Sequence, residues 1–329
     1  MSNPDLHHQL KTITSNLLTP DVNYNAIRMA VHELKDLFYK AVDFDEAEAA
    51  KQQHIQTAGG QAINIYTAAL IITDMMRTRK FLMGIKEAVD VRLKTNPGKP
   101  VTVFYAGSGP FATLLTPLTT IFSPDQLQMI LLEINPASIH YLEKTIQQFG
   151  LEKYIAGVEE ADAVLYSIPG KYQPDILLSE TMRPSLQKEP QVSIVANLLP
   201  QCKNKPILIP ESIMVEACLM GYQGIDAPSL KSLHILLNLD SSSAVEIKKE
   251  PVISTGIVIH IPEKPEPLYT SLALTTTVKV FGDHIIGAQE SGLTMIRPEM
   301  DLAAIPGYPA SFLIRYIMNE NPGFEMKIL

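Results

Sequence analysis

The sequence predicts an α/β protein: a parallel sheet with connecting helices, a helical region before it and an antiparallel β region after it. Three observations predict this fold class. Apolar residues recur at helical spacing before residue 97, strand-like and helix-like segments alternate from about 100 to 220, and β-like runs follow. A chain of 329 residues is long enough for two domains with a sizeable core. We divide it into residues 1–97, 98–215 and 216–329.

Composition narrows the classes of function. Basic residues number 27 and acidic residues 35, a formal net charge of −8, which argues against a general nucleic-acid binder. Cys202 and Cys218 are too few for a disulfide framework or a cysteine metal cluster, and we predict no metal site. No apolar run reaches about 18 residues and the N-terminus lacks a secretory pattern, so we expect a cytoplasmic protein without a membrane span.

Two helical segments are expected in the first region. Apolar residues fall at helical spacing over 24–44. A longer run over 61–94 also reads as helix. It begins after Gly59-Gly60 and ends before Asn96-Pro97-Gly98, which stops a helix.

The middle region alternates strands with helices. Residues 101–106 are apolar and partly β-branched, and they end in Gly107-Ser108-Gly109. Strands that alternate with helices imply a parallel sheet with right-handed crossovers. The other elements expected here are a helix at 111–121, a strand at 128–134, a helix at 136–149 with proline in its first turn, and strands at 155–158 and 175–179.

The last region reads as mostly antiparallel. Residues 252–261 and 275–280 are rich in β-branched side chains, and turn signals stand at 281–283 and 291–292. Strands separated by short turns favour antiparallel pairing.

A nucleotide-like site is expected where the first strand ends. Ligands of an open parallel sheet collect beyond the carboxyl ends of its strands, and glycines there let the backbone approach a ligand closely. Gly107 and Gly109 follow the first strand. Glu133 ends the second, 26 positions after Gly107 (133 − 107), where a carboxylate can accept two hydrogen bonds from a ribose diol. An adenosine ligand is favoured, although Ala112 at the third glycine position still permits NAD.

An acidic cluster follows the third strand, in Val158-Glu159-Glu160-Ala161-Asp162. A carboxylate at this edge of the sheet could meet an adenine amino group. The same residues also fit a surface turn, and the sequence leaves both readings open.

Two glutamates follow the fourth strand. Glu180 lies just past its carboxyl end, and Glu189 comes nine positions later (189 − 180). A loop of that length can fold back and bring both carboxylates to one point. Like charges so close raise one pKa unless a cation lies between them. A guanidinium suits that place because it is planar, permanently charged and binds carboxylates through two hydrogen bonds.

The loop resembles that of the protein arginine methyltransferases, a branch of the class I S-adenosylmethionine-dependent enzymes. The family's hairpin reads Ser-Glu, eight residues, then Glu, as Ser179, Glu180 and Glu189 do here. Residues 74–85 are similar to the family's helix pattern Asp-x-x-Arg-Thr-x-x-aromatic. The resemblance implies a Rossmann-like domain that binds S-adenosylmethionine and a C-terminal antiparallel β-barrel-like domain, with a closing strand near 293–298.

The resemblance also implies roles for single residues. Arg77 would hold the carboxylate of the cofactor's methionine part; by itself, the spacing of Asp74 and Arg77 indicates only a helix-surface ion pair. The other implied roles are cofactor binding by Gly107, Gly109, Glu133 and Glu159, and catalysis by Glu180 and Glu189.

The chain departs from the family at several points. Tyr105 replaces an acidic residue, residues 57–61 lack the aromatic-rich helix start, and residues 272–274 stand where Thr-His-Trp is usual. Most of these departures affect the motifs with which the family binds the protein substrate that accepts the methyl group. The favoured acceptor is therefore free arginine or a small arginine-like molecule, as in related bacterial enzymes of natural-product pathways. Candidates to hold its other polar groups are Gln61, Asn64, Tyr66, Arg183 and His284.

The implied reaction is in-line transfer of a methyl group to a guanidino nitrogen, with Glu180 and Glu189 clamping the guanidinium. Three other functions stay open: a peptide or protein arginine methyltransferase, another small-molecule N- or O-methyltransferase, and a non-catalytic scaffold that binds the cofactor. The segment between the barrel strands is short for the family's dimerisation arm, which leaves a homodimer open.

Overall fold

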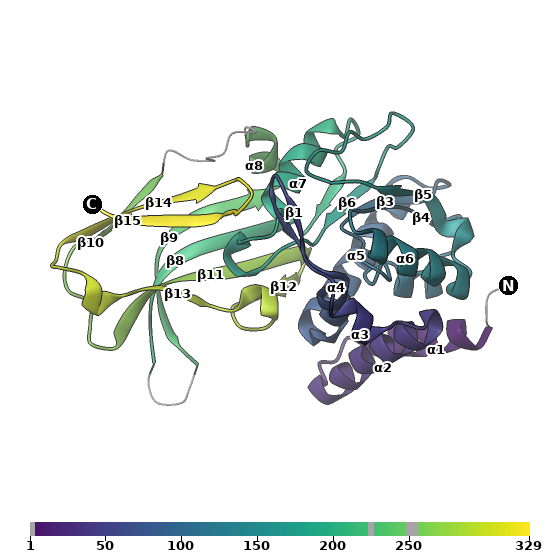
Figure 1. The fold of residues 1–329 in the computed structure, drawn as a ribbon, viewed down its shortest axis with the longest axis horizontal. Coiled ribbons are helices and arrows are strands. Elements are labelled where there is room, and N and C mark those ends of the chain that lie inside the picture. Colours follow the sequence, from purple (N-terminus) through teal and green to yellow (C-terminus); the bar gives the residue numbers. More distant parts are fainter. Residues whose placement is uncertain (1–3, 223–226, 248–255) are drawn as a thin grey trace.

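The computed structural model describes residues 4–222, 227–247 and 256–329. Figure 1 shows three parts in chain order: N-terminal helices, a parallel sheet with its helices, and antiparallel strands at the far end of the molecule from α1 and α2. Strand β1 runs between the parallel sheet and the antiparallel strands (Figure 1). The predicted fold class is confirmed.

The helix expected over 24–44 is confirmed as α2. It begins after Asn23, whose side chain accepts a hydrogen bond from the Ala26 N–H, and its buried residues recur at helical spacing. The helices before the central sheet are α1 (Pro4–Leu17), α2 (Tyr24–Val42), α3 (Glu46–Ala49), α4 (Ile65–Leu70), the 3₁₀ helix η1 (Ile71–Thr73) and α5 (Met75–Thr95).

The single helix expected over 61–94 is wrong. Its start belongs to a hairpin, in which β1 (Ile55–Thr57) pairs antiparallel with β2 (Gly60–Ala62). The turn between them is Ala58-Gly59, a length typical of tight hairpins. The rest of the run is divided among α4, η1 and α5.

Five parallel strands form the central sheet, in the order β5-β4-β3-β6-β7. The chain enters at β3 and adds strands first on one side and then on the other, which creates the switch point where ligands of such sheets bind. The four expected strands are present as β3 (Val101–Ala106), β4 (Leu127–Glu133), β5 (Ile155–Glu160) and β6 (Ile176–Ser179). The fifth strand, β7 (Ile207–Ile209), was not expected from the sequence.

One of the two connecting helices expected here is present. Helix α6 (Pro136–Phe149) begins after Asn135, which caps it, as a helix with proline in its first turn should. The helix expected over 111–121 is wrong: Ala112 has a left-handed φ of 43°, and the segment forms turns and the 3₁₀ helix η2 (Thr116–Thr120). The remaining helices of this part are η3 (Glu152–Tyr154), η4 (Pro184–Leu186), α7 (Gln191–Leu198) and η5 (Leu199–Gln201).

The C-terminal strands are antiparallel, as expected. One sheet has the order β12-β11-β8-β9, with β13 also on β11, and the other has the order β10-β14-β15. Among the described residues, hydrogen bonding does not close these strands into a barrel. Of the strand expected over 252–261, residues 252–255 lie outside the described residues. The elements are β8 (Ser212–Gly221), β9 (Ser229–Asp240), α8 (Ser241–Glu246), β10 (Ile257–Ile261), β11 (Tyr269–Phe281), β12 (His284–Ile286), η6 (Gly292–Thr294), β13 (Arg297–Asp301), η7 (Leu302–Ala304), β14 (Ala310–Ile317) and β15 (Gly323–Ile328).

The three parts share one apolar core. Helix α5 lies directly on β11, because a Cβ at Gly84 would come within 2.7 Å of the Cγ1 of Val280. The division that we placed at residue 215 falls inside β8. In the portions of the chain that are described, no helix is long and apolar enough to cross a membrane.

Candidate functional site

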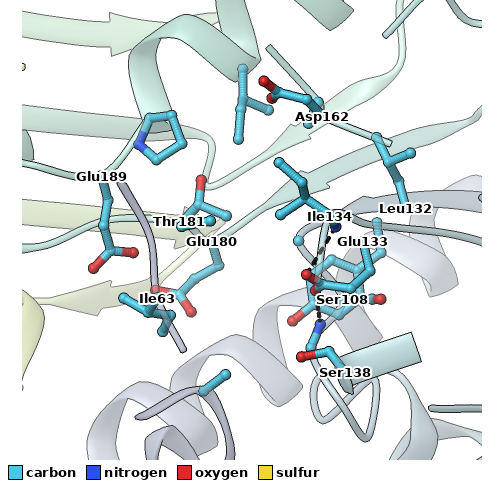
Figure 2. A pocket seen from close by; sticks show the side chains of 18 of the residues that line it. Ile63, Ser108, Leu132, Glu133, Ile134, Ser138, Asp162, Glu180, Thr181 and Glu189 are labelled. Carbon is cyan, nitrogen blue, oxygen red and sulfur yellow. Dashed lines mark hydrogen bonds between the residues drawn. The ribbon is translucent and has the colours of Figure 1, made fainter. Parts of the chain in front are cut away.

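A cavity lies beyond the carboxyl ends of β3, β4 and β6. Figure 2 shows its polar side chains at two ends: Ser108, Glu133 and Ser138 at one, Glu180 and Glu189 at the other. Of the predicted site residues, Gly107, Gly109, Glu133, Glu180 and Glu189 line this cavity, whereas Arg77 and Glu159 do not.

The turn after β3, formed by Gly107, Ser108 and Gly109, lines the cavity with its backbone and with the Ser108 hydroxyl. Gly107 and Gly109 have left-handed φ angles of 78° and 65°, which glycine adopts without strain. A Cβ on Gly107 would lie 2.5 Å from the Cγ2 of Thr181. Glycine therefore also lets the turn contact the loop of residues 180–189, here called the glutamate loop. The Ser108 hydroxyl between them is buried and has no hydrogen-bond partner among the described residues. A ligand in the cavity could form a hydrogen bond with this hydroxyl and so remove the cost of leaving it unpaired.

Glu133 is held by the backbone around it. Its Oε2 accepts a hydrogen bond from the Gly109 N–H at 2.7 Å, and its Oε1 accepts from the Ile134 and Asn135 N–H groups, both at 2.9 Å. Burial raises the pKa of Glu133, and these N–H groups oppose the rise. A carboxylate has about four acceptor positions, so about one remains for a ligand, fewer than the two that a ribose diol would use.

The acidic cluster after β5 divides between two environments. Glu159 accepts a hydrogen bond from the Tyr172 hydroxyl at 2.7 Å and lies outside the cavity lining. Asp162 lines the cavity, and its Oδ1 accepts from the Val164 N–H at 2.9 Å. The structure therefore brings Asp162, and not Glu159, to the place where a carboxylate could meet a ligand.

Glu180 and Glu189 are buried together at the other end of the cavity, with side chains only 3% and 8% exposed. Each is paired with one arginine: Oε2 of Glu180 accepts a hydrogen bond from Arg77 Nη2, and Oε1 of Glu189 accepts from Arg183 Nε at 2.9 Å. The second oxygen of each carboxylate has no hydrogen-bond partner in the described parts of the chain. Two such oxygens at one cavity end can accept hydrogen bonds from a planar cation.

The electrostatics of this end are set by burial. Burial raises the pKa of Glu180 to about 7; Arg77 opposes the rise, and Glu189 and Asp74 add to it. Burial likewise raises the pKa of Glu189, against the opposing effect of Arg183 and Arg77.

Tyr105 stands beside these groups and lines the cavity. Burial raises the pKa of its phenol, and the nearby carboxylate of Glu180 raises it further. Tyr105 therefore places a neutral hydroxyl beside the carboxylate of Glu180.

Gln191 fixes the start of the glutamate loop. Its side chain is 1% exposed; its Oε1 accepts from the Thr181 N–H and its Nε2 donates to the Ser179 carbonyl, both at 2.9 Å. These bonds hold the backbone on either side of Glu180. The sequence offered no signal for this role beyond a polar residue at the start of an apolar helix.

The middle of the loop is held by the C-terminal strands. Ser185 and Leu186 have left-handed φ angles of 57° and 55°, which is uncommon outside glycine. The Ser185 N–H donates to Thr276 Oγ1 on β11 at 2.8 Å, and the Tyr316 hydroxyl on β14 donates to the Leu186 carbonyl at 2.7 Å. Such backbone persists only where its surroundings enforce it, so the C-terminal sheets help to place both glutamates.

The β1–β2 hairpin is a part of the site that sequence reasoning missed. The Gln61 N–H donates to the Lys188 carbonyl at 2.6 Å, and a Cβ on Gly60 would lie 2.7 Å from that same oxygen. The hairpin therefore lies directly on the glutamate loop. Two adjacent glycines between short β-compatible segments are the signal that indicates it. Its cavity-lining residues are Thr57, Ala62 and Ile63.

Arg77 is buried beside the cavity, so the alternative of a surface ion pair with Asp74 is wrong. Asp74 instead caps α5 by accepting from the Arg77 N–H at 3.2 Å. Its other oxygen accepts from Ser291 Oγ at 2.7 Å and from the Gly292 N–H at 2.8 Å. These bonds attach the start of α5, which carries Arg77, to the segment at Ser291 and Gly292 in the C-terminal part of the chain. The Nε of Arg77 is buried without a partner among the described residues.

The other predicted candidates do not line the cavity. Asn64 caps α4, and Tyr66 packs against the core. His284 pairs with Glu87 at 3.0 Å, ten residues along α5 from Arg77 (87 − 77), which is about 15 Å of helix. In the described ranges, no group of three or more His, Cys, Asp or Glu side chains could hold a metal ion.

Comparison with known proteins agrees with this architecture at the level of fold. The chain is similar to a Trypanosoma brucei PRMT1 enzyme–prozyme heterotetrameric complex with AdoHcy, at 13% identity over 78% of this chain and 91% of that one, with a TM-score of 0.54. It is also similar to PRMT6 with SAH, at 12% identity over 80% of this chain and 100% of that one, with a TM-score of 0.58. No protein-family model and no curated protein sequence matches the chain. At such identities the likeness establishes the fold that this chain shares with the two structures.

Proposed function

We propose that this protein is an S-adenosylmethionine-dependent N-methyltransferase that methylates a guanidino group, with free arginine or a small arginine-like molecule as the favoured acceptor. One observation carries the proposal. Two buried glutamates from one loop, of which Glu180 has a buried Oε1 with no hydrogen-bond partner among the described residues, line a cavity whose other end is built from a glycine turn and Glu133.

The residues of the cavity fit the cofactor. The unpartnered Ser108 hydroxyl, the left-handed turn at Gly107 and the remaining acceptor position of Glu133 suit a nucleoside. Asp162 would accept from an adenine amino group in place of Glu159, and Arg77 would hold the carboxylate of the cofactor. The two structural neighbours contain AdoHcy and SAH, the form that S-adenosylmethionine takes after losing its methyl group. When bound, S-adenosylmethionine supplies a methyl group activated by a positively charged sulfur.

The glutamates would position and polarise the acceptor. Hydrogen bonds to Glu180 and Glu189 would fix the plane of the guanidinium and draw its positive charge toward the carboxylates, which leaves the attacking nitrogen richer in electrons. Alignment of this kind is worth about 7–11 kcal/mol in well-oriented reactions. A proton must also leave the nitrogen, and Glu180, with a pKa of about 7, is suited to accept it.

The acceptor side of the site favours a small molecule. Leu272, Ala273 and Leu274, where the family has Thr-His-Trp, are fully buried in β11 and do not reach the cavity. No histidine is found among the described residues that line the cavity. The groups that would engage a peptide loop are therefore replaced by core side chains.

A screen with methyl-labelled S-adenosylmethionine tests the proposal. We expect methyl transfer to free arginine, identified by mass spectrometry, and little transfer to an Arg/Gly-rich peptide. Preferential transfer to the peptide would favour the peptide or protein arginine methyltransferase. Cofactor binding by calorimetry without transfer to any guanidine would favour another small-molecule methyltransferase or a scaffold. A homodimer stays a prediction, which light scattering in solution would check.

The pH dependence of the reaction tests the role of Glu180. The value of kcat/KM for the acceptor is expected to rise with pH through about 7 and then level off, because a carboxyl with a raised pKa is protonated below that pH and cannot attract a cation. Glu189, whose pKa is also raised, acts in the same direction, while Arg77 and Arg183 keep their charge. Cofactor affinity, measured over the same range as a control, should change little. A flat profile down to pH 5.5 would contradict this role.

A further inference from the structure

Arg183, which is partly exposed, pairs with Glu189, which lines the cavity. The two residues belong to the same loop, and Arg183 Nε donates to Glu189 Oε1 at 2.9 Å. The Glu189 side chain is 8% exposed, but that of Arg183 is 36% exposed. Arg77, which holds the other glutamate, is 9% exposed and fixed at the start of a 21-residue helix. Of the two arginines, Arg183 is therefore the one that has room to move.

Glu189 already has a cationic partner in Arg183, which occupies its Oε1. An acceptor guanidinium brought to Glu189 would place a second positive charge beside one carboxylate in a buried place, and an uncompensated buried charge is costly. That cost is removed if the acceptor also brings an anion that takes Arg183 from Glu189. The freed Oε1 of Glu189 then becomes available to the acceptor guanidinium.

We propose that Arg183 determines acceptor specificity by moving from Glu189 to a carboxylate of the acceptor, an inference that rests on the proposed function. The acceptor class is then a guanidino acid, with guanidinium and carboxylate on one small molecule. A guanidine without a carboxylate cannot draw Arg183 away from Glu189. It must therefore compete with Arg183 for the Glu189 carboxylate. An arginine inside a peptide has no α-carboxylate to offer and meets the same obstacle.

The chain offers a matched control in Lys188. It is an exposed cation in the same loop with a left-handed φ of 63°, and no ion pair involves it among the described residues. Lys188 lines a separate surface hollow together with Gln56 and Glu320. Lys188→Gln therefore removes the same charge from the same loop without touching Glu189.

The test compares free arginine with agmatine, which is arginine without its carboxylate. For the wild type we expect kcat/KM with arginine to exceed that with agmatine by about 100-fold, in line with a charge pair at a desolvated site. Arg183→Gln should lower the value for arginine by about 100-fold and leave or raise that for agmatine, so that the ratio approaches one. Arg183→Lys should fall between, and Lys188→Gln should keep the wild-type ratio. Calorimetric affinities for both compounds in the presence of S-adenosylhomocysteine should follow the same pattern.

Two outcomes overturn the assignment of Arg183 and leave the proposed function standing. One is a wild type that uses agmatine or an internal peptide arginine as well as free arginine. The other is an Arg183→Gln variant, folded by circular dichroism, that loses arginine and agmatine equally. If no guanidine compound accepts a methyl group from the wild type, the proposed function fails and the assignment fails with it.

Discussion

Glu180→Gln is expected to lower kcat/KM for methyl transfer by about 10³-fold while the affinity for S-adenosylmethionine stays within a few-fold of the wild type. The substitution keeps the shape of the side chain but removes the charge that attracts the guanidinium. Loss of one partner of a buried, hydrogen-bonded charge pair costs about 2–5 kcal/mol, and the upper half of that range corresponds to this loss. Turnover with labelled cofactor and calorimetry of cofactor binding measure the two effects separately.

Glu189→Gln should behave in the same direction, since Glu189 lines the same end of the cavity. A matched control is Glu325→Gln, which removes an exposed carboxylate paired with Arg315 on the C-terminal sheet. Exposed pairs contribute little, so this variant should keep wild-type activity and stability. Near-normal turnover of Glu180→Gln would remove the basis of the proposed function.

Glu133→Ala is expected to weaken cofactor binding by more than about 100-fold and to lower the free energy of unfolding by about 3 kcal/mol. Three backbone N–H groups lose their acceptor in this variant, at Gly109, Ile134 and Asn135. A hydrogen bond to a charged group makes a net contribution of about 1.5–3 kcal/mol, and the total loss stays near the lower end because water can enter the space left by the side chain and accept from the freed N–H groups. Because one of these bonds fixes the glycine turn, the binding surface for the nucleoside loosens together with the fold.

Calorimetry and denaturant unfolding would measure the two effects of Glu133→Ala. Glu133→Gln, which keeps acceptor capacity on one oxygen only, should lie between the wild type and Glu133→Ala in both. Glu159→Gln is the control, because Glu159 lies outside the cavity lining and its bond goes to Tyr172. Unchanged cofactor affinity in Glu133→Ala would show that Glu133 has no part in the site.

Features determined by neighbours in the chain could be predicted from the sequence. Helix α6 follows from a cap at Asn135 and a proline in its first turn, and the parallel strands follow from buried apolar runs. The glycine turn and the position of Glu133 at the next strand end follow from the same local pattern. Two helices were predicted wrongly. Residues 60–62 pair with β1 in a hairpin although the sequence predicted the start of a helix. Ala112 has a left-handed φ within a segment where a helix was expected.

The partners of the site residues could not be predicted in this way. Arg77 lies 103 positions from Glu180, and Tyr316 lies 130 positions from the Leu186 carbonyl that it binds. Whether Glu159 or Asp162 reaches the cavity depends on how the chain leaves β5, and no spacing rule decides between them. Gln191 holds Glu180 only because the loop folds back on its own strand.

By itself, the sequence determined the fold class, the glycine turn, and the two glutamates on one loop, because these depend on backbone preferences and apolar periodicity over a few residues. Only the tertiary structure decided that both glutamates are buried, that each is held by its own arginine, and that the hairpin and the C-terminal strands place the loop. The reason is physical: burial of a charge and the choice of its partner depend on packing between segments far apart in the chain, and packing leaves no mark on local spacing.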